Sequence, residues 1–386
     1  MYNEYIGVGE AFDGKGTYIQ ENAERRMEYA SRKARYSIME QRKTIPAPFE
    51  KGVNFTNWLE FRTAEQIHPD FFTFQDFENA RKLGCDVIRL PIHFEKICQE
   101  ADGFRIPQKV LDILDHVAAW CAELKMYIIF DFHNDCSADS ATHDDVDKIL
   151  VPVWTQLASR YKDHSQYIVY EIMNEPHVIS IERWNEILGR LFRLIRSIDE
   201  KHWIIVGGAD WNSTAAMKTL PDFQDDRVIY NFHYYDPHTF THQGAPWCHM
   251  ERVLGIPFPY DAEKMPPLPE NPTEVEKRCF DNYPVNGQLS AVIDCFDQYV
   301  EFSRERNAPV FCGEFGCLMT VPNDLRINWY RIVARLLAER GIARTSWDYF
   351  GGFGVFHRVP RGVRPQFPQD LNRELLSAMG LNADVE

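Results

Sequence analysis

The chain has 386 residues, of which 45 % are hydrophobic and 26 % are charged, and these values are typical of a globular protein. This length allows two average domains or one large α/β barrel, and the chain lacks the run of about 18 apolar residues that a membrane span needs. Forty-two Lys and Arg against 57 Asp and Glu give a formal net charge of −15, which repels phosphate backbones. We therefore expect a neutral ligand and neither nucleic acid nor a membrane as a partner.

Residues 1–50 precede the regular pattern of the rest of the chain. Segment 21–43 is rich in Arg and Glu and predicts a surface helix, which Pro46 and Pro48 would end. We expect this N-terminal extension to pack on the main domain or to join two copies of the chain into a homo-oligomer. The first residues, Met1 to Glu4, carry no basic or apolar leader, so the protein is expected to be cytoplasmic or to have lost a signal peptide after secretion.

From residue 51 to residue 386, short β-branched or aromatic runs alternate with longer amphipathic segments. Eight runs are typical of strands: 52–58, 87–91, 127–133, 168–174, 203–208, 228–235, 309–316 and 344–351. Six segments between them have helical spacing: 73–83, 107–125, 146–162, 181–198, 289–307 and 325–340. Eight such β-then-α units predict a parallel sheet closed into a (β/α)8 TIM barrel. An open doubly wound sheet is the alternative, but no G-x-G-x-x-G loop follows the first strand.

A long interval, residues 236–288, follows the sixth predicted strand and contains nine prolines. Long loops inside a compact domain are usually functional, and prolines stiffen the backbone. We expect this insertion to form a fixed wall beside the barrel mouth.

Polar and aromatic residues gather at the carboxyl ends of the predicted strands, where barrel enzymes have their active sites. Two of them are glutamates, Glu175 after the fourth strand and Glu314 on the seventh. These two strands face each other across the mouth, so the two carboxyl groups could flank one scissile glycosidic bond. Glu171 lies deeper on the same face as Glu175 and is expected to be a core carboxylate paired with Arg89.

Metal and thiol chemistry are not expected from the residue spacing. Nine cysteines are scattered without a C-x-x-C pair, and no H-x-H or H-E-x-x-H motif occurs. Neither a disulfide framework, a metal site nor a cofactor is therefore predicted, and the default for the cysteines is packing.

With these residues in view, the chain from 51 to about 355 resembles glycoside hydrolase family 5, retaining β-glycanases on a (β/α)8 barrel. The matching motifs are Gly52-Val53-Asn54, Val87-Ile88-Arg89-Leu90-Pro91, Asp131-Phe132-His133, Asn174-Glu175-Pro176, His233-Tyr234-Tyr235, Glu314-Phe315-Gly316 and Trp347. The resemblance implies that Glu175 is the acid/base and Glu314 the nucleophile. It implies supporting roles for five residues: Arg89, His133, Asn174, His233 and Tyr235. Trp347 would be a platform for a sugar ring.

Five further residues near the predicted strand ends are candidates for substrate contacts: Asn54, Trp58, Asn134, Trp211 and Trp247. The three tryptophans among them could equally belong to the core. The expected activity is that of an endo-acting retaining β-glucanase that hydrolyses β-1,4 bonds in a polysaccharide or oligosaccharide, such as a cellulose derivative or mixed-linkage β-glucan. β-Mannan, xyloglucan and β-1,3-glucan are alternative substrates. An inactive sugar-binding barrel and a metal-dependent hydrolase are alternatives of other classes.

We expect the two glutamates to differ in protonation. The guanidinium of Arg89 and the hydroxyl of Tyr235 would favour the charged form of Glu314. The negative charge of Glu314 would in turn raise the pKa of Glu175 and keep that carboxyl group protonated.

Overall fold

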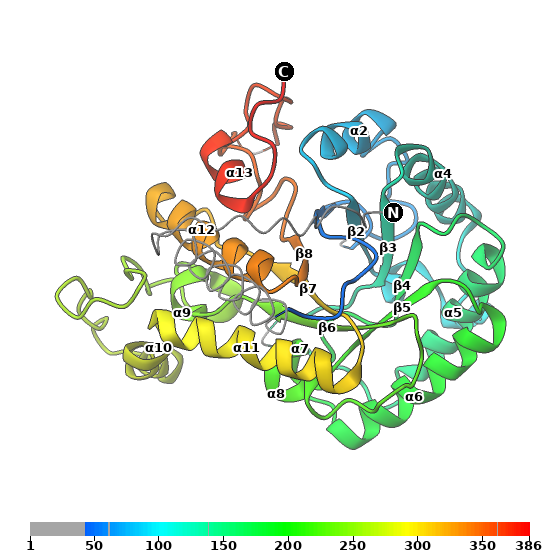
Figure 1. Ribbon diagram of the computed structural model, residues 1–386, viewed down its shortest axis with the longest axis horizontal. Helices are drawn as coiled ribbons and strands as arrows, with labels where there is room; N and C mark the ends of the chain where they lie inside the picture. Colours follow the sequence, from blue (N-terminus) through cyan, green and yellow to red (C-terminus); the bar gives the residue numbers. More distant parts are fainter. Residues whose placement is uncertain (1–42, 61, 138, 361) are drawn as a thin grey trace, which may run out of the picture. The chain divides into compact units, whose positions relative to one another are not determined.

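The computed structural model describes residues 43–386 apart from 61, 138 and 361. Eight parallel strands close into a barrel in sequence order, with β1 pairing to both β2 and β8. Figure 1 shows the strands surrounded by helices. The prediction of a (β/α)8 barrel is therefore confirmed. The predicted helix of segment 21–43, except for its last residue, lies outside the described residues, so its packing and any role in a homo-oligomer stay predictions.

The strands are short and almost completely buried. They are β1 (Lys51–Asn54), β2 (Val87–Ile92), β3 (Tyr127–Phe132), β4 (Ile168–Glu171), β5 (Trp203–Gly207), β6 (Val228–Tyr234), β7 (Val310–Phe315) and β8 (Ala343–Ser346). Parallel strands covered by helices on the outside read as near-continuous apolar runs, which is why all eight could be located in the sequence.

The six predicted helices are all present and lie outside the barrel (Figure 1). They are α2 (Phe74–Lys82), α4 (Gln108–Leu124), α5 (Asp147–Tyr161), α6 (Ile181–Ile198), α11 (Leu289–Arg306) and α12 (Asn323–Glu339). In α6 the Ser180 side chain caps the first turn by accepting a hydrogen bond from the Arg183 N–H at 3.1 Å. Trp184, Leu188 and Leu191, three or four residues apart, are buried on one face of the helix.

Shorter helices complete the connections. They are α3 (Phe94–Ile97), η1 (Glu100–Asp102), α7 (Ala209–Asn212), α8 (Thr214–Met217) and α13 (Arg373–Met379), which packs on α12. Two four-residue helices, α7 and α8, replace a full helix after β5. This replacement explains why the predicted interval after the fifth strand is the shortest of the series.

Three strands end at least three residues earlier than predicted. β1 stops at Asn54, β4 at Glu171 and β8 at Ser346, whereas the sequence patterns extended them to 58, 174 and 351. The backbone turns out of the sheet soon after each of the first two ends, with a positive φ of 65° at Asn57 and of 32° at Glu175. Left-handed backbone cannot continue a strand.

The inside of the barrel changes from apolar to polar along the strands. Near the amino ends, Phe49 and one side chain from each of β2 to β8 form an apolar cluster: Val87, Ile129, Val169, Ile205, Ile229, Phe311 and Ala343. Side chains on one face of a strand recur every two residues. The next inward positions therefore lie two residues further along each strand. On four of these strands that position is polar: Arg89, Asp131, Glu171 and Asn231. These residues form the floor of the site described below.

The insertion 236–288 is more regular than predicted. It contains α9 (His238–Thr241), η2 (Pro246–Cys248) and α10 (Glu274–Asn286). The Thr273 hydroxyl accepts from the Glu276 N–H at 3.2 Å, and the Glu276 carboxylate accepts from the Thr273 N–H at 2.8 Å. This reciprocal capping starts α10 despite the prolines around it.

Among the helices of the described residues, none is both long enough and apolar enough to pass through a lipid bilayer.

Candidate active site

Glu314 lies on β7 with 5 % of its surface exposed, and both of its carboxylate oxygens accept a hydrogen bond. Arg89 Nη1 donates to Oε1 at 2.7 Å, and the Tyr235 hydroxyl donates to Oε2 at 2.7 Å. Hydrogen bonds from a cation and from a hydroxyl group stabilise the charged carboxylate. The three side chains come from β2, from β7 and from the residue that follows β6.

Arg89 is fully buried, and its guanidinium organises the floor of the site. It forms a two-pronged ion pair with Glu171, with distances of 2.7 Å and 2.9 Å. This contact confirms the predicted pairing. Arg89 also lies 3.0 Å from Asp131 and donates to the Asn174 Oδ1 at 2.7 Å. Burial raises the pKa of Asp131 to about 8 and also raises the pKa of Glu171, and the charge of Arg89 opposes both rises.

Glu175 lies four residues beyond the end of β4, and its side chain is 12 % exposed. The Nδ1 atom of His233 lies 2.5 Å from Glu175 Oε1, and the thiol of Cys136, which donates to the Asn134 carbonyl oxygen at 3.3 Å, lies beside this carboxyl group. Burial raises the pKa of Glu175, and the contact with Cys136 opposes that rise. The expected rise in the pKa of Glu175 is therefore present. Its largest cause is burial, whereas we had expected the negative charge of Glu314 to cause it.

A chain of hydrogen bonds sets the proton position on His233. The side-chain oxygen of Asn231 accepts from the Gly313 N–H at 3.0 Å, so the Asn231 amide nitrogen faces Glu171 and His233 Nε2. An amide N–H that points at Nε2 requires Nε2 to be the acceptor, which leaves the proton on Nδ1. Burial lowers the pKa of His233 to about 4, so the imidazole is neutral and donates through Nδ1 to Glu175.

The two glutamates approach each other closely. One oxygen of Glu175 and one oxygen of Glu314 lie within 4.8 Å of each other, and His233 Nδ1 lies 3.7 Å from Glu314 Oε2. This separation is on the scale of the about 5 to 5.5 Å between the carboxyl groups of retaining glycosidases and is shorter than the roughly 6.5 to 9.5 Å of inverting ones.

His133 and Trp347 line the mouth above Arg89. Their rings are nearly parallel, with centroids 5.5 Å apart and an interplanar angle of 11°. The Nδ1 atom of His133 lies 2.7 Å from Asp131 Oδ2, and burial lowers the pKa of His133 to about 4. Trp347 is half-buried.

Two predicted substrate contacts are wrong, because the side chains have no exposed surface. Asn54 donates to the carbonyl oxygens of Gly313 and Ser346, both at 3.1 Å, and is part of the barrel floor. Trp58 lies in the core, where its indole N–H donates to the His68 carbonyl at 2.9 Å.

The other predicted contacts lie at or near the surface of the site. Asn134 is 6 % exposed and hydrogen-bonds to Asn174, which is itself buried. Trp211 is 37 % exposed and stacks on His177, with ring centroids 4.7 Å apart. Trp247 is 44 % exposed in the insertion. The roles of these residues toward a substrate stay predictions.

The structure adds two residues that the sequence reading did not single out. Cys136 contacts the carboxyl group of Glu175, and Asn174 Nδ2 lies 2.9 Å from its sulfur. His177 contacts the backbone of Glu175, because the Nδ1 atom of His177 lies 2.8 Å from the Glu175 carbonyl oxygen. Cys136 and His177 are each two residues from a predicted site residue, Asn134 and Glu175, and this nearness could have suggested that they belong to the site. Nearness in the sequence does not show, however, which way the side chain of a loop residue points.

A closed parallel barrel with two neighbouring carboxyl groups at its mouth, one bound by a guanidinium and a hydroxyl group and one with a raised pKa, is the arrangement of a barrel glycoside hydrolase. Comparison with known proteins agrees with this class. The family model described as Cellulase (glycosyl hydrolase family 5) matches residues 49–351. The chain therefore belongs to glycosyl hydrolase family 5.

Characterised relatives extend over most of the chain. Endoglucanase C of Acetivibrio thermocellus is 28 % identical over 316 residues, which cover 78 % of this chain and 91 % of that protein. Cellodextrinase A of Ruminococcus flavefaciens is 26 % identical over 305 residues, covering 76 % and 83 % of the two chains. The crystal structure of endoglucanase Cel5A from Thermotoga maritima superimposes with a TM-score of 0.70 at 25 % identity, covering 88 % and 99 % of the two chains.

Proposed function

We propose that this enzyme is an endo-acting β-glucanase that hydrolyses β-1,4 bonds of neutral β-glucans by double displacement, with Glu314 as nucleophile and Glu175 as acid/base. The observation that carries the proposal is the approach of their oxygens to within 4.8 Å, in two different electrostatic settings. Such a gap leaves no room for the water that an inverting enzyme places between its carboxyl groups and the sugar.

In the first step, a Glu314 oxygen forms a bond to the anomeric carbon while the glycosidic bond breaks. Glu175 gives its proton to the leaving oxygen, so the departing chain leaves as a neutral alcohol. The hydrogen bonds from Arg89 and Tyr235 orient the attacking carboxylate until the bond forms.

In the second step, water attacks the anomeric carbon and breaks the ester to Glu314. Glu175, now a carboxylate, takes the proton of that water. The neutral His233 stabilises this charged form by donating through Nδ1. Hydrolysis of the ester returns Glu314 to its charged form and Glu175 to its protonated form.

The substrate class is supported by charge and by the relatives. A net charge of −15 disfavours anionic polysaccharides, and the partly exposed rings of Trp347, Trp211 and Trp247 suit the apolar faces of neutral sugars. Two of the relatives are endoglucanases, and a third is named a cellodextrinase. β-Mannan is the second candidate, because Thermotoga maritima Cel5A has also been solved in complex with mannotriose.

The roles of the two glutamates can be tested with azide as a substitute nucleophile. On an activated aryl β-cellobioside, Glu314→Ala should lose at least about a thousandfold in rate, and azide should restore turnover with an α-glycosyl azide as product. Glu175→Ala should instead form a β-glycosyl azide, because azide then attacks the glycosyl-enzyme. Glu339→Gln, on the exposed side of α12, is the matched control and should keep full activity. Near-full activity of Glu314→Ala would contradict the proposal.

The substrate can be tested by the products formed from soluble cellulose derivatives, mixed-linkage β-glucan, β-mannan, xyloglucan and β-1,3-glucan. An endo-β-1,4-glucanase lowers the viscosity of the first two early in the reaction and releases the β-anomer first. Faster cleavage of β-mannan would support the second candidate, and binding of all of these without cleavage would support the sugar-binding alternative.

A further inference from the structure

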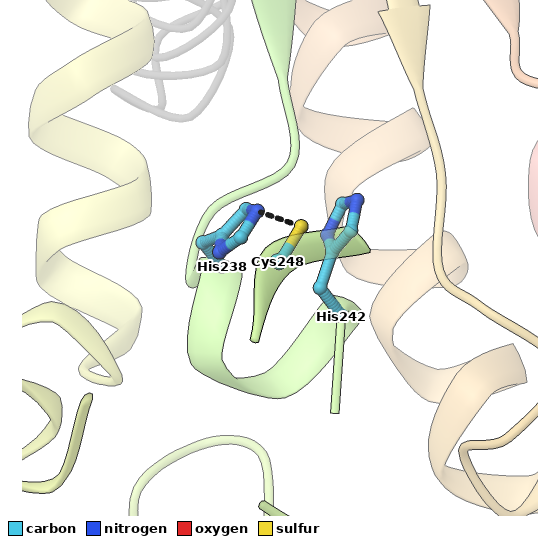
Figure 2. A group of neighbouring side chains, drawn as sticks. All are labelled: His238, His242 and Cys248. Atoms are coloured by element: carbon cyan, nitrogen blue, oxygen red, sulfur yellow. Dashed lines mark hydrogen bonds between the residues drawn. The ribbon is translucent and has the colours of Figure 1, made fainter. Parts of the chain in front are cut away.

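Three metal-binding side chains gather outside the proposed catalytic residues. His238 begins α9, His242 directly follows the last residue of α9, and Cys248 ends η2. One ligand atom from each residue lies within 4.8 Å of the others. Figure 2 shows the three side chains directed toward one another, with the sulfur between the two imidazole rings. The proposed hydrolysis uses none of them.

The backbone of the insertion holds this group together. A spacing of four residues places His238 and His242 on one side of the helical turn, whose last hydrogen bond runs from the His242 N–H to the His238 carbonyl at 3.0 Å. The Gly244 N–H then bonds to the Met250 carbonyl at 3.1 Å, which folds η2 back onto α9. Gly244 has a φ of 82°, a conformation that glycine adopts without strain. This main-chain hydrogen bond therefore places Cys248 beside the two histidines.

The donor atoms select a class of metal. Two imidazole nitrogens and one thiolate suit zinc, whereas calcium and magnesium prefer oxygen. His238 Nε2 and Cys248 Sγ are 3.8 Å apart. In a tetrahedral zinc site, with bonds of about 2.0 to 2.1 Å to nitrogen and about 2.3 Å to sulfur, these atoms would be roughly 3.5 Å apart. His238 Nε2 and Cys248 Sγ would therefore have to approach each other only slightly to bind one zinc ion.

We propose that His238, His242 and Cys248 form a zinc site, with water or a solute as the fourth ligand. The two imidazole rings are stacked with centroids 4.1 Å apart and planes at 16°, so binding requires one ring to turn until both lone pairs face the metal. His238 is exposed and can turn, whereas His242 is buried beside Tyr235 and Phe353, with ring centroids 5.0 Å and 5.4 Å away.

The site has a defined structural effect. His242 packs on the ring of Tyr235, whose hydroxyl donates to Glu314. Zinc would tie α9 to η2 and fix the first part of the insertion beside the barrel mouth, while the carboxyl groups carry out the hydrolysis. We therefore expect zinc to raise the thermal stability of the enzyme and to be unnecessary for the bond-breaking step.

Zinc binding can be measured directly on the full chain, purified without a histidine tag, kept reduced and freed of metal with a chelator. Titration against a chromophoric chelator should give one zinc per chain, and zinc should raise the melting temperature. His238→Ala and Cys248→Ser should each weaken binding by at least about tenfold, since even changes to the partners of metal ligands cost about 10- to 100-fold. His242 is buried, so its substitution is not used.

Two neighbouring residues provide matched controls. His249→Ala removes an adjacent half-exposed imidazole, and Cys279→Ser removes a nearby thiol, so both variants should bind zinc as the parent does. Co²⁺ in place of zinc should give a thiolate-to-metal absorption band that Cys248→Ser abolishes. Absence of one-to-one binding, a cobalt band that persists in Cys248→Ser, or loss of binding in the control variants alone would overturn the proposal.

Discussion

The carboxyl group of Glu175 has two neutral neighbours, the Nδ1–H of His233, which donates to it, and the thiol of Cys136. A neutral donor stabilises a carboxylate less than a cation does, so burial prevails and the pKa of Glu175 remains raised. Glu314, in contrast, receives a hydrogen bond from the guanidinium of Arg89. The difference between a charged and an uncharged donor therefore separates the proposed roles of two identical side chains.

Cys136 gives a direct test of this balance. Replacing Cys136 with Ala removes a thiol that lowers the pKa of Glu175, so this pKa should rise. Because the proposed acid works in its protonated form, activity should extend to higher pH, and the alkaline limb of the profile of kcat against pH should move upward. Cys279→Ser, a thiol change in the insertion, should leave the profile in place. An unchanged or downward-shifted limb in Cys136→Ala would contradict this role.

Tyr235 is expected to act mainly on the rate of the chemical step. Tyr235→Phe removes the 2.7 Å hydrogen bond to Glu314 and leaves the ring in place. A hydrogen bond to a charged group is worth about 1.5 to 3 kcal/mol, which corresponds to roughly a 10- to 150-fold fall in kcat, with a smaller change in KM. Steady-state kinetics on a soluble β-glucan would measure this split. Tyr260→Phe in the insertion is the control, and an equal loss of rate in that variant would contradict the assignment.

Individual residues could be predicted where the strand itself fixes their direction. Arg89 and Glu171 occupy inward positions of β2 and β4, and their ion pair followed from period-two alternation. Trp58 lies past the end of β1, where the positive φ of Asn57 turns the chain and sends the indole into the core. Such a turn leaves no hydrophobic pattern in the sequence, and the same is true of the direction of Cys136.

Elements of the barrel were predictable for a similar reason. Each strand is buried on both sides and appears in the sequence as a continuous apolar run. Each long helix is buried on one side and appears as apolar residues spaced three or four apart. The insertion follows different rules, because α9 and η2 are single turns and α10 begins at a capping box between prolines. Hydrogen bonds over a few residues determine these helices, and a search for long amphipathic segments misses them.

Two tryptophans test the distinction between core and insertion. Trp58 is fully buried after β1, so Trp58→Ala should lower the free energy of unfolding by about 3 to 5 kcal/mol. Trp247 is 44 % exposed beside α9, so Trp247→Ala should change stability by less than about 0.5 kcal/mol and should raise KM for a long oligosaccharide. Urea unfolding of both variants measures the two stability losses, and steady-state kinetics measures the change in KM. Equal stability losses would contradict the structural distinction.

For the whole molecule, buried ionisable groups set the dependence of stability on pH. Burial raises the pKa of Asp348 from 3.8 to about 6, so the folded chain binds a proton that the unfolded chain releases between these values. Stability from this group is fully present below about pH 4 and is lost as pH rises to about 6. Burial lowers the pKa of His133 and His233 from 6.5 to about 4, so they act in the opposite direction and cost stability as pH falls from 6.5 to 4.

The contribution of Asp348 can be isolated with Asp348→Asn. The difference in unfolding free energy between this variant and the parent should shift in favour of the variant from pH 4 to pH 6, by up to about 3 kcal/mol, and should be constant above pH 6. Urea unfolding at pH 4, 5, 6 and 7 measures the change. Asp139→Asn, at a side chain that is 87 % exposed, is the control. A difference that does not vary with pH would show that Asp348 is charged throughout.

The two proposed catalytic groups are attached to the barrel in different ways. Glu314 belongs to a strand and is paired with His233 of β6, although the register of this strand to both β6 and β8 shifts next to it. Glu175 instead follows three residues beyond β4 that are held by single contacts, such as the 2.9 Å bond from the Asn174 N–H to the Phe132 carbonyl. The proposed nucleophile is therefore attached within the sheet, and the proposed acid is attached through a loop. An engineer who seeks a different working pH would do best to vary His177, which lies 2.8 Å from the Glu175 carbonyl oxygen, and to keep Asn174, because Asn174 contacts the Arg89 side chain that holds the attacking group.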